Sequence, residues 1–366
     1  MKVFSRLLSL RVSALLALMG LSRAGYAQHI EVFDAPGATE TYPNAVNEFG
    51  RITGYHEDAS RHLHGFVRSP FGTISVFDAP PFGDSTVGVG VGTVPLAINA
   101  TGQIVGTVWG VVSGVLGARG FVRDERGMIA EFEAAPGAVR TDVQAINVFG
   151  WAAGIYREAS SLAHGFVRSP YGTLSTFDAP GFLTFIREIR PNGDVIGVYQ
   201  QSSGLFHGFV RELSGSFSTF DAPDVDPGVG GVFCGHCAGT FTTAATPTGR
   251  IVGYYGATGG LIRAFLRTPD GAFSNLDVPG AIGTRPEAIN IEGAVAGEYV
   301  NSGPFAQHGF LLPRHGSLES FDLPDASRLV VTGIDLQNKV IGYFADASGT
   351  HGFIRRPRAG CNHFHF

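Results

Sequence analysis

Six pairs of charged residues recur along the chain at a single spacing. In each pair a histidine or arginine is followed 14 positions later by an acidic residue, a combination that could serve acid–base chemistry. A single active site needs one such pair, whereas a pair in every repeat is explained more simply by hydrogen bonding that locks the fold. We therefore predict a structural role. The pairs are His64 and Asp78, Arg119 and Glu133, His164 and Asp178, His207 and Asp221, Arg263 and Asp277, and His308 and Asp322.

Another combination of charges, Glu188 and Arg190, occurs once. It interrupts a repeated segment that otherwise resembles Ala-Ile-Asn, in which the first residue is small in the other copies. Glu188 takes the small position and Arg190 takes the asparagine position. Residues two apart on a strand share a face. The sequence therefore predicts either a polar ligand contact or a mutual salt bridge that fills a gap.

Two of the three cysteines begin and end the segment Cys-Gly-His-Cys at Cys234 and Cys237. This tetrapeptide resembles the active site of disulfide isomerases, but the βαβ context of that motif is absent from the sequence. We expect a local disulfide between Cys234 and Cys237. Free thiols are an alternative, as is a metal site with further ligands from Cys361, His363 or His365. Neither a metal ion nor a cofactor is predicted.

Two long repeats carry insertions that we predict to be loops. Gly83–Gly92 and Val108–Gly117 are rich in Gly and Val, and Asp224–Thr243 contains the cysteine segment. Loops on a rigid scaffold commonly carry binding function, although neutral surface excursions cost little entropy. The candidate ligand-binding residues are therefore Trp109, Glu188 and Arg190.

Three sequence elements recur in the same order along the chain. They read Phe-Asp-Ala-Pro-Gly, Ala-Ile-Asn-x-x-Gly-x-Ile-x-Gly and His-Gly-Phe-Val-Arg, with variations, and each occurs seven times. Short β-branched and aromatic runs between Gly, Pro, Asn and Ser are typical of strands and turns. We predict four strands per unit, which in the first unit lie near Asn44–Asn47, Ile52–His56, His64–Arg68 and Thr73–Asp78.

The last two strands of each unit should form a hairpin, and the 14-residue spacing predicts its register. Folding the first hairpin about its midpoint places Gly65 opposite Phe77, so that the ring can lie over bare backbone. In the fifth unit Ala264 replaces the glycine and Leu276 replaces the phenylalanine. Direct contact between the two positions predicts such an exchange of volume.

Seven four-stranded units predict an all-β domain over residues 28–366, a seven-bladed β-propeller. An open β-solenoid is the alternative. The small position of Ala-Ile-Asn should then fall on the strand nearest the propeller axis. We expect Ile30–Asp34 to complete the last blade, because Asp34 would supply the acid for His351. The tail Cys361–Phe366 competes for the same edge.

The repeat units also resemble a known family. Ala-Ile-Asn-x-x-Gly-x-Ile-Val-Gly followed by His-Gly-Phe-Val-Arg-Ser-Pro is similar to the bacterial extracellular HAF-repeat family, named for a His-Ala-Phe tripeptide. The resemblance covers essentially all of residues 28–366, with Gly in place of Ala in most tripeptides. It implies export and a repeat fold. It implies no established activity and supplies no catalytic residue.

The first 27 residues have the pattern of a secretory signal peptide. Basic residues precede an apolar run over residues 12–21, and small residues at Gly25 and Ala27 mark a cleavage site. The apolar run is shorter than the roughly 20 residues that span a bilayer. We therefore expect a secreted or periplasmic monomer without a membrane-inserted segment.

The charge of the chain argues against two classes of partner. The net charge is −5, and removing residues 1–27 takes away four basic residues and no acidic one, which leaves −9. An acidic chain without a Lys/Arg run does not attract nucleic acid or anionic membrane surfaces.

The sequence is compatible with three functions. We expect an exported non-catalytic protein that binds a polysaccharide or protein ligand through its channel face and long loops. An enzyme such as a glycoside hydrolase or lyase is the alternative. It would need two or more non-repeated carboxylates near the axis, about 5–10 Å apart for glycoside hydrolysis, and only Glu188 is visible. A passive envelope or surface component is the third reading.

Overall fold

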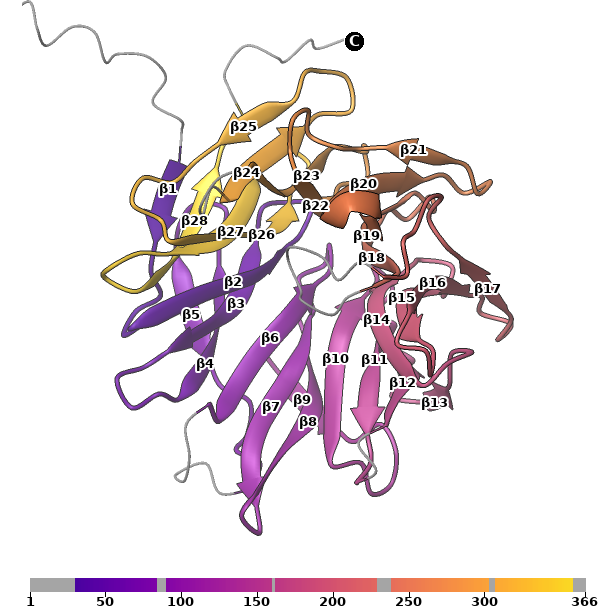
Figure 1. Cartoon of the computed structure of the whole chain (residues 1–366). Helices are drawn as coiled ribbons and strands as arrows, with labels where there is room; N and C mark the ends of the chain where they lie inside the picture. The colour runs from indigo at the N-terminus through magenta and orange to yellow at the C-terminus, as the bar shows by residue number, and fades with distance from the viewer. Residues whose placement is uncertain (1–29, 84–89, 160–161, 229–237, 303–306, 358–366) are drawn as a thin grey trace, which may run out of the picture.

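A computed structural model describes residues 30–83, 90–159, 162–228, 238–302 and 307–357 (Figure 1). The predicted signal peptide, Cys234, Cys237 and Cys361 lie outside these residues, so the expected disulfide and its alternatives stay predictions. In the described part the helical element is a single 3-10 turn, η1 (Thr258–Gly260), and no helix is long and apolar enough to cross a membrane.

The strands form successive antiparallel units in which each strand pairs with the next along the chain. The first three units contain β2 (Glu40–Val46), β3 (Ile52–Glu57), β4 (Leu63–Arg68) and β5 (Ile74–Phe77); β6 (Gly92–Ile98), β7 (Ile104–Val112), β8 (Val115–Arg123) and β9 (Ile129–Phe132); and β10 (Arg140–Ile146), β11 (Ala152–Arg157), β12 (Ala163–Arg168) and β13 (Leu174–Phe177). The next three contain β14 (Leu183–Ile189), β15 (Val195–Gln200), β16 (Phe206–Arg211) and β17 (Phe217–Phe220); β18 (Thr240–Ala245), β19 (Ile251–Ala257), β20 (Leu261–Arg267) and β21 (Phe273–Asn275); and β22 (Gly283–Ile289), β23 (Val295–Val300), β24 (Gln307–Leu312) and β25 (Glu319–Phe321). The last contains β26 (Arg328–Ile334), β27 (Val340–Ala345) and β28 (Thr350–Arg355), and β28 also pairs with β1 (Ile30–Phe33).

Two local predictions are corrected. The first strand of the first unit begins at Glu40 rather than near Asn44, because its backbone already pairs with Glu57 of β3 there. The insertion Val108–Gly117 is a continued β7–β8 hairpin rather than a loop. Its two-residue turn has positive φ at both Ser113 (52°) and Gly114 (78°), the geometry that matches the twist of paired strands.

The predicted register of the outer hairpins is confirmed. The Gly of His-Gly-Phe or its equivalent faces the Phe of Phe-Asp-Ala-Pro in the register of the paired strands. These pairs are Gly65 and Phe77, Gly120 and Phe132, Gly165 and Phe177, Gly208 and Phe220, Gly309 and Phe321, and Gly352 and Phe33.

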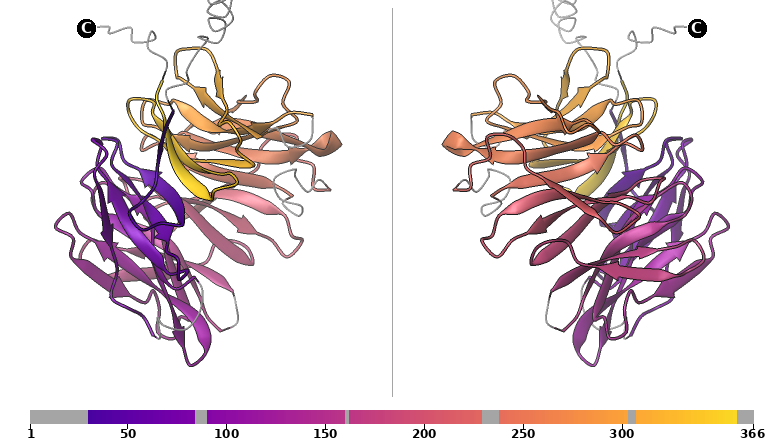
Figure 2. Two further views of the ribbon diagram at one scale, coloured as in Figure 1. Left: turned by 90° about the vertical axis from the view of Figure 1, so that its left-hand side faces the viewer. Right: turned by 90° about the vertical axis from the view of Figure 1, so that its right-hand side faces the viewer.

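The units follow one another around a central space, with their first strands innermost (Figure 1). In the side views the first and last units lie next to each other (Figure 2). Two pairings join them: Glu40 of β2 is the parallel partner of Thr350 in β28, and β1 continues the sheet beyond β28. His351 Nδ1 lies 2.9 Å from Asp34 Oδ1 at the end of β1.

Consecutive units pack through buried phenylalanines and stacked arginines. The Phe of His-Gly-Phe is almost fully buried in every unit, and the Arg that ends this element in most units lies over a Phe of the preceding unit. Such cation–π contacts align neighbouring sheets. They join Arg68 to Phe33 (5.0 Å), Arg123 to Phe77 (4.7 Å), Arg168 to Phe132 (4.9 Å), Arg211 to Phe177 (4.5 Å), Arg267 to Phe220 (4.5 Å) and Arg355 to Phe321 (5.6 Å).

Candidate functional site

Every innermost strand carries a β-bulge at the same place, one residue before the small position of Ala-Ile-Asn. A bulge adds an unpaired residue and re-aims the neighbouring side chains. Here the bulged residue and the small residue after it both line the central cavity. The bulged residues are Asn44, Leu96, Gln144, Arg187, Thr243, Glu287 and Thr332.

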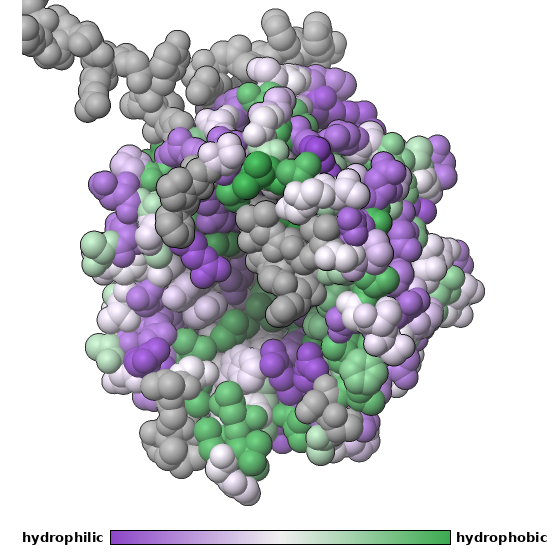
Figure 3. Space-filling model, in the orientation of Figure 1, coloured by the Kyte–Doolittle hydropathy of each residue, from purple (hydrophilic) through white to green (hydrophobic). Residues whose placement is uncertain are grey.

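The central cavity has a volume of about 460 Å³ and is lined by the innermost strands and the turns that follow them. Figure 3 shows the molecule hollowed near the middle of one face, with polar and apolar residues around the hollow. Small-molecule sites have volumes of about 300–1,000 Å³. The small positions lie on this wall, as expected for the strand nearest the axis. They are Ala45, Ala97, Ala145, Ala244, Ala288 and Gly333.

Three of the bulged side chains hold neighbouring units together. Each uses one polar atom for a hydrogen bond to the backbone of the next unit, which fixes the side chain in one orientation. The bonds are Thr332 Oγ1 donating to Pro43 O (2.8 Å), Asn44 Nδ2 donating to Pro95 O (2.7 Å), and Ile186 N donating to Gln144 Oε1 (3.3 Å).

The two charged bulge residues do not make this bond between units. Glu287 forms an ion pair with Arg285, two residues earlier on the same strand. Arg187 is exposed and makes no ion pair or hydrogen bond with any residue that the structure describes. The sequence offered no sign of either residue's place on the cavity wall, because alternation along an unbulged strand would turn Arg187 away from the face of Glu188.

Glu188 lies on the cavity wall, where protein encloses its carboxyl group while part of the side chain stays open to the cavity. Burial, together with the nearby charge of Glu48, raises the pKa of Glu188 to about 8, although the Ile189 N–H donates to Oε1 at 3.2 Å. Burial likewise raises the pKa of Glu287 to about 8, against the opposing effect of Arg285. Burial therefore disfavours the charged form of both carboxyl groups, and Glu188, which forms no ion pair with any described residue, retains its proton near neutral pH.

The predicted salt bridge between Glu188 and Arg190 is wrong. Arg190 Nη2 instead lies 3.1 Å from Asp194 Oδ2. The reason is local: β14 is bulged at Arg187 and ends at Ile189, so Arg190 belongs to the turn. Arg190 still borders the cavity, but its guanidinium is already paired.

Comparisons with known proteins bear on the fold. No protein-family model and no curated protein matches the chain. Among solved structures, the chain is similar to a streptogramin B lyase (TM-score 0.56) and to virginiamycin B lyase from Staphylococcus aureus (TM-score 0.57). Each is 12% identical and covers 90% of this chain, and the match covers 98% and 99% of those chains. These proteins are β-propellers. The fold is a β-propeller.

A puromycin hydrolase structure matches more partially. The TM-score is 0.52 at 13% identity, and the match covers 86% of this chain and 52% of that chain. At such identities the likeness concerns the fold alone, because propellers host many unrelated functions. The activities in these names belong to those proteins.

The asparagine of Ala-Ile-Asn bonds turn backbone and also joins consecutive blades. Asn47 Oδ1 accepts hydrogen bonds from Phe49 N (3.1 Å) and Arg51 N (3.0 Å), while Nδ2 donates to Asn99 O of the next blade (3.1 Å). Asn147 Nδ2 donates to Arg190 O in the same way (2.9 Å). These turns form the rim of the cavity.

The charged pairs at the 14-residue spacing face each other at the outer edge of the blades. The distances are 3.0 Å for His64 Nδ1 to Asp78 Oδ1, and 2.6, 2.8 and 2.5 Å for the corresponding atoms of His164 and Asp178, His207 and Asp221, and His308 and Asp322. Arg119 lies 2.9 Å from Glu133, and Arg263 lies 2.9 Å from Asp277.

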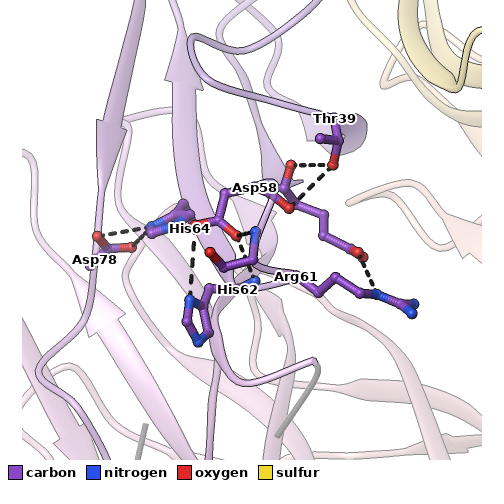
Figure 4. A network of polar contacts seen from close by, with 8 residues as sticks. Thr39, Asp58, Arg61, His62, His64 and Asp78 are labelled. Atoms are coloured by element: carbon purple, nitrogen blue, oxygen red, sulfur yellow. Dashed lines mark hydrogen bonds and ion pairs between the residues drawn. The ribbon is translucent and has the colours of Figure 1, made fainter. Parts of the chain in front are cut away.

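These pairs are partly buried: the histidine side chains are 16–28% exposed, while acids such as Asp178 reach 69%. Exposed ion pairs contribute little stability, so their role is to align the hairpin. Figure 4 shows the first pair within a wider network, in which His64 lies between Asp78 and Asp58. The described residues contain no cluster of three His, Cys, Asp or Glu side chains placed to hold a metal ion.

Trp109 lies apart from the cavity. It pairs with Gly92 at the end of the β6–β7 hairpin that is remote from the cavity-lining turn, and Arg140 covers its ring at 4.4 Å. The structure thus brings Glu188 and Arg190 to one wall and leaves Trp109 elsewhere. A ligand contact by Trp109 stays a prediction.

The raised pKa of Glu188 predicts a pH-dependent stability. Between about pH 4.5 and 8 the unfolded chain ionises this group while the folded chain keeps it protonated, so its ionisation disfavours the folded state increasingly across that range. Glu188→Gln should leave stability unchanged at pH 4. At pH 8.5 it should raise stability by about 2 kcal/mol, a value reduced for contact with cavity water. Urea unfolding at both pH values measures this, and equal curves at pH 8.5 would contradict it.

Proposed function

We propose that the chain is a seven-bladed propeller closed by its N-terminal strand. Three contacts support this closure: β1 pairs with β28, Arg68 of the first blade stacks on Phe33 of β1, and Thr332 of the last blade bonds Pro43 of the first. Closure matters for function, because it makes the cavity wall continuous.

The function that this geometry supports best is binding of a hydroxyl-rich ligand, a glycan, in the axial cavity. The observation that carries the proposal is the asymmetry of the cavity wall. In a repeat protein a purely structural channel needs only one residue type per position, yet the bulge positions hold amide, hydroxyl, apolar, cationic and acidic side chains. Differing donors and acceptors around one concave site are what orient a small ligand.

Part of this wall is preorganised for hydrogen bonding. The bond from Asn44 Nδ2 to Pro95 leaves Asn44 Oδ1 as an acceptor, and the bond that Gln144 Oε1 accepts leaves Nε2 as a donor. Protonated Glu188 adds an O–H donor. Sugar hydroxyls both donate and accept, so this set suits a glycan. Fixed orientations reduce the entropy that is lost on binding.

A matched pair of variants tests the location. Leu96 lies on the cavity wall of the second blade and makes no structural hydrogen bond there, while Leu116 lies at the distant tip of the β7–β8 hairpin and is 52% exposed. Leu96→Trp should fill the cavity and weaken binding at least tenfold, whereas Leu116→Trp should leave binding unchanged. Isothermal titration would use tetrasaccharides of glucose, mannose, N-acetylglucosamine and galacturonate with residues 28–366.

The outcomes separate the alternatives. Equal binding by the wild type and both variants would move the site to the loops, and no binding of any tetrasaccharide would favour the passive structural role. Enzymatic turnover stays the second candidate, because the structure adds Glu287 to Glu188 as a second non-repeated carboxyl group on the wall. Reducing-end release from the same tetrasaccharides would detect a hydrolase.

We further propose export of the mature chain, on the pattern of residues 1–27, and membership of the HAF-repeat family, on the repeat motifs. Both proposals suit a glycan ligand, since an exported protein meets polysaccharides outside the cell. N-terminal sequencing of the protein recovered from the culture medium or periplasm tests the first. A mature protein that still begins at Met1 would contradict it.

A further inference from the structure

We infer that the axial cavity recognises an acidic sugar, and that Arg187 binds the carboxylate of a uronic acid residue. This inference deepens the proposed glycan function and rests on it. Its basis is a difference among the equivalent bulge residues of the cavity wall. Most of the polar ones form hydrogen bonds or ion pairs within the protein, whereas Arg187 forms none with the described residues.

The bulge positions show what the fold requires of this site. Thr332, Asn44 and Gln144 each bond the backbone of the next blade, and Thr243 Oγ1 donates to Val252 O within its own blade (3.2 Å). Leu96 shows that the position also tolerates a side chain without polar atoms. For a structural role, the bulge position needs either a neutral polar side chain or no polar group at all. A guanidinium group is not required there for stability.

Arg187 is unpaired among the described residues although acidic groups lie within electrostatic reach. Its positive charge acts on both Glu287 and Tyr254, so Arg187 lies within electrostatic range of the fifth and sixth blades. Yet Glu287 pairs with Arg285, and Arg190, the other arginine of the wall, pairs with Asp194. Within the part of the chain that the structure describes, no group engages the five N–H donors of Arg187, which are therefore open to a ligand.

The chemistry of this group selects the ligand. A guanidinium presents two parallel N–H donors that match a carboxylate, and the match combines hydrogen bonding with charge. A lone cation balances one negative charge, which fits a uronate better than a doubly charged phosphate. The neighbouring acids repel a bound carboxylate only weakly. Glu287 is already paired with Arg285, and Glu188 is protonated near neutral pH because burial raises its pKa. Glu48 is the remaining carboxyl group on this wall.

The test compares tetragalacturonate with its fully methyl-esterified form, which differs only in a methyl group on each of the four carboxylates and in the charge that these groups remove. At pH 6.5 the wild-type protein should bind the acid at least tenfold more tightly than the ester. Arg187→Gln should lower affinity for the acid at least tenfold and change affinity for the ester less than twofold. Arg314→Gln, on the exposed β24–β25 turn, removes an equal charge outside the cavity and should preserve the preference.

Each result has a distinct meaning. Equal wild-type affinity for acid and ester overturns the carboxylate inference but leaves the glycan function intact. An acid preference that survives in Arg187→Gln assigns recognition to another residue and also overturns it. Failure of the wild type to bind either probe or any neutral tetrasaccharide overturns the proposed function itself. Should Arg187→Gln not fold, the wild-type comparison at 20 and 300 mM salt still decides, because only binding of the acid should weaken with salt.

Discussion

Removing the N-terminal strand should destabilise the whole propeller by about 5 kcal/mol or more, although only a few residues are lost. A chain that begins at Ala35 lacks β1, and with it the pairing to β28 and the ring of Phe33. That ring packs edge-on against Phe66 (centroid distance 6.3 Å) and lies beneath Arg68. Its loss would leave the core between the first and last blades open to water.

The measurement is chemical denaturation of residues 28–366 against residues 35–366, followed by circular dichroism and tryptophan fluorescence. A synthetic peptide of residues 28–37, added in trans, should restore part of the lost stability by adding a strand to the free edge of β28. Phe33→Ala offers a milder version, with an expected loss of about 3–5 kcal/mol.

The competing prediction, that the tail Cys361–Phe366 fills the edge, is tested in parallel. A chain that ends at Pro357 should be as stable as the full mature chain if β1 closes the ring. A loss of stability on removing the tail, with none on removing residues 28–34, would contradict the proposed closure.

Adding a single methyl group at Gly309 should cost about 3 kcal/mol of stability. A Cβ at this position would lie 2.2 Å from Cζ of Phe321, closer than real carbon contacts allow. The Phe321 ring cannot move away, because it is fully buried against Phe353 (centroid distance 6.0 Å) and beneath Arg355. Urea unfolding of Gly309→Ala measures the cost.

The fifth blade supplies the compensating exchange. There the equivalent positions are Ala264 and Leu276, and Leu276 N donates to Ala264 O at 3.1 Å, so the two residues keep the same register. Adding Phe321→Leu to Gly309→Ala should therefore cost less than the sum of the two single changes by at least 1 kcal/mol. Strict additivity would show that ring and methyl group do not compete for space. As a control, Ala264→Gly should cost no more than about 1 kcal/mol.

Much of the architecture could be predicted from the sequence, because neighbouring hairpin strands are constrained by local spacing. The 14-residue interval from histidine to acid predicts the register that places Gly65 opposite Phe77. In the fifth unit a larger residue at Ala264 is accompanied by a smaller one at Leu276, and this compensation indicates that the two positions are in contact. His351 has no acidic residue 14 positions later in the chain, so Asp34 is the acid that matches it, and this match predicts the pairing of β1 with β28.

The cavity wall could be predicted only in part. The small size of residues such as Ala97 indicates the innermost strand, and Glu188 stands out because it breaks that rule. A salt bridge between Glu188 and Arg190 would require β14 to continue as a regular strand beyond Ile189, where it ends. The composition of Val108–Gly117 indicates a loop and not the observed hairpin, because glycine-rich sequence does not distinguish a loop from a hairpin with a glycine turn.

The sequence by itself determined the repeat, the strands and the register within each outer hairpin, since these depend on residues near one another in the chain. Only the tertiary structure decided which side chains share the cavity. The bulge before each small position is a register shift that appears only when the innermost strand pairs with the strand after it, so the residue pattern alone does not show it. That added residue turns Arg187 and Glu287 onto the same wall as Glu188, where side chains 100 residues apart in sequence line one cavity.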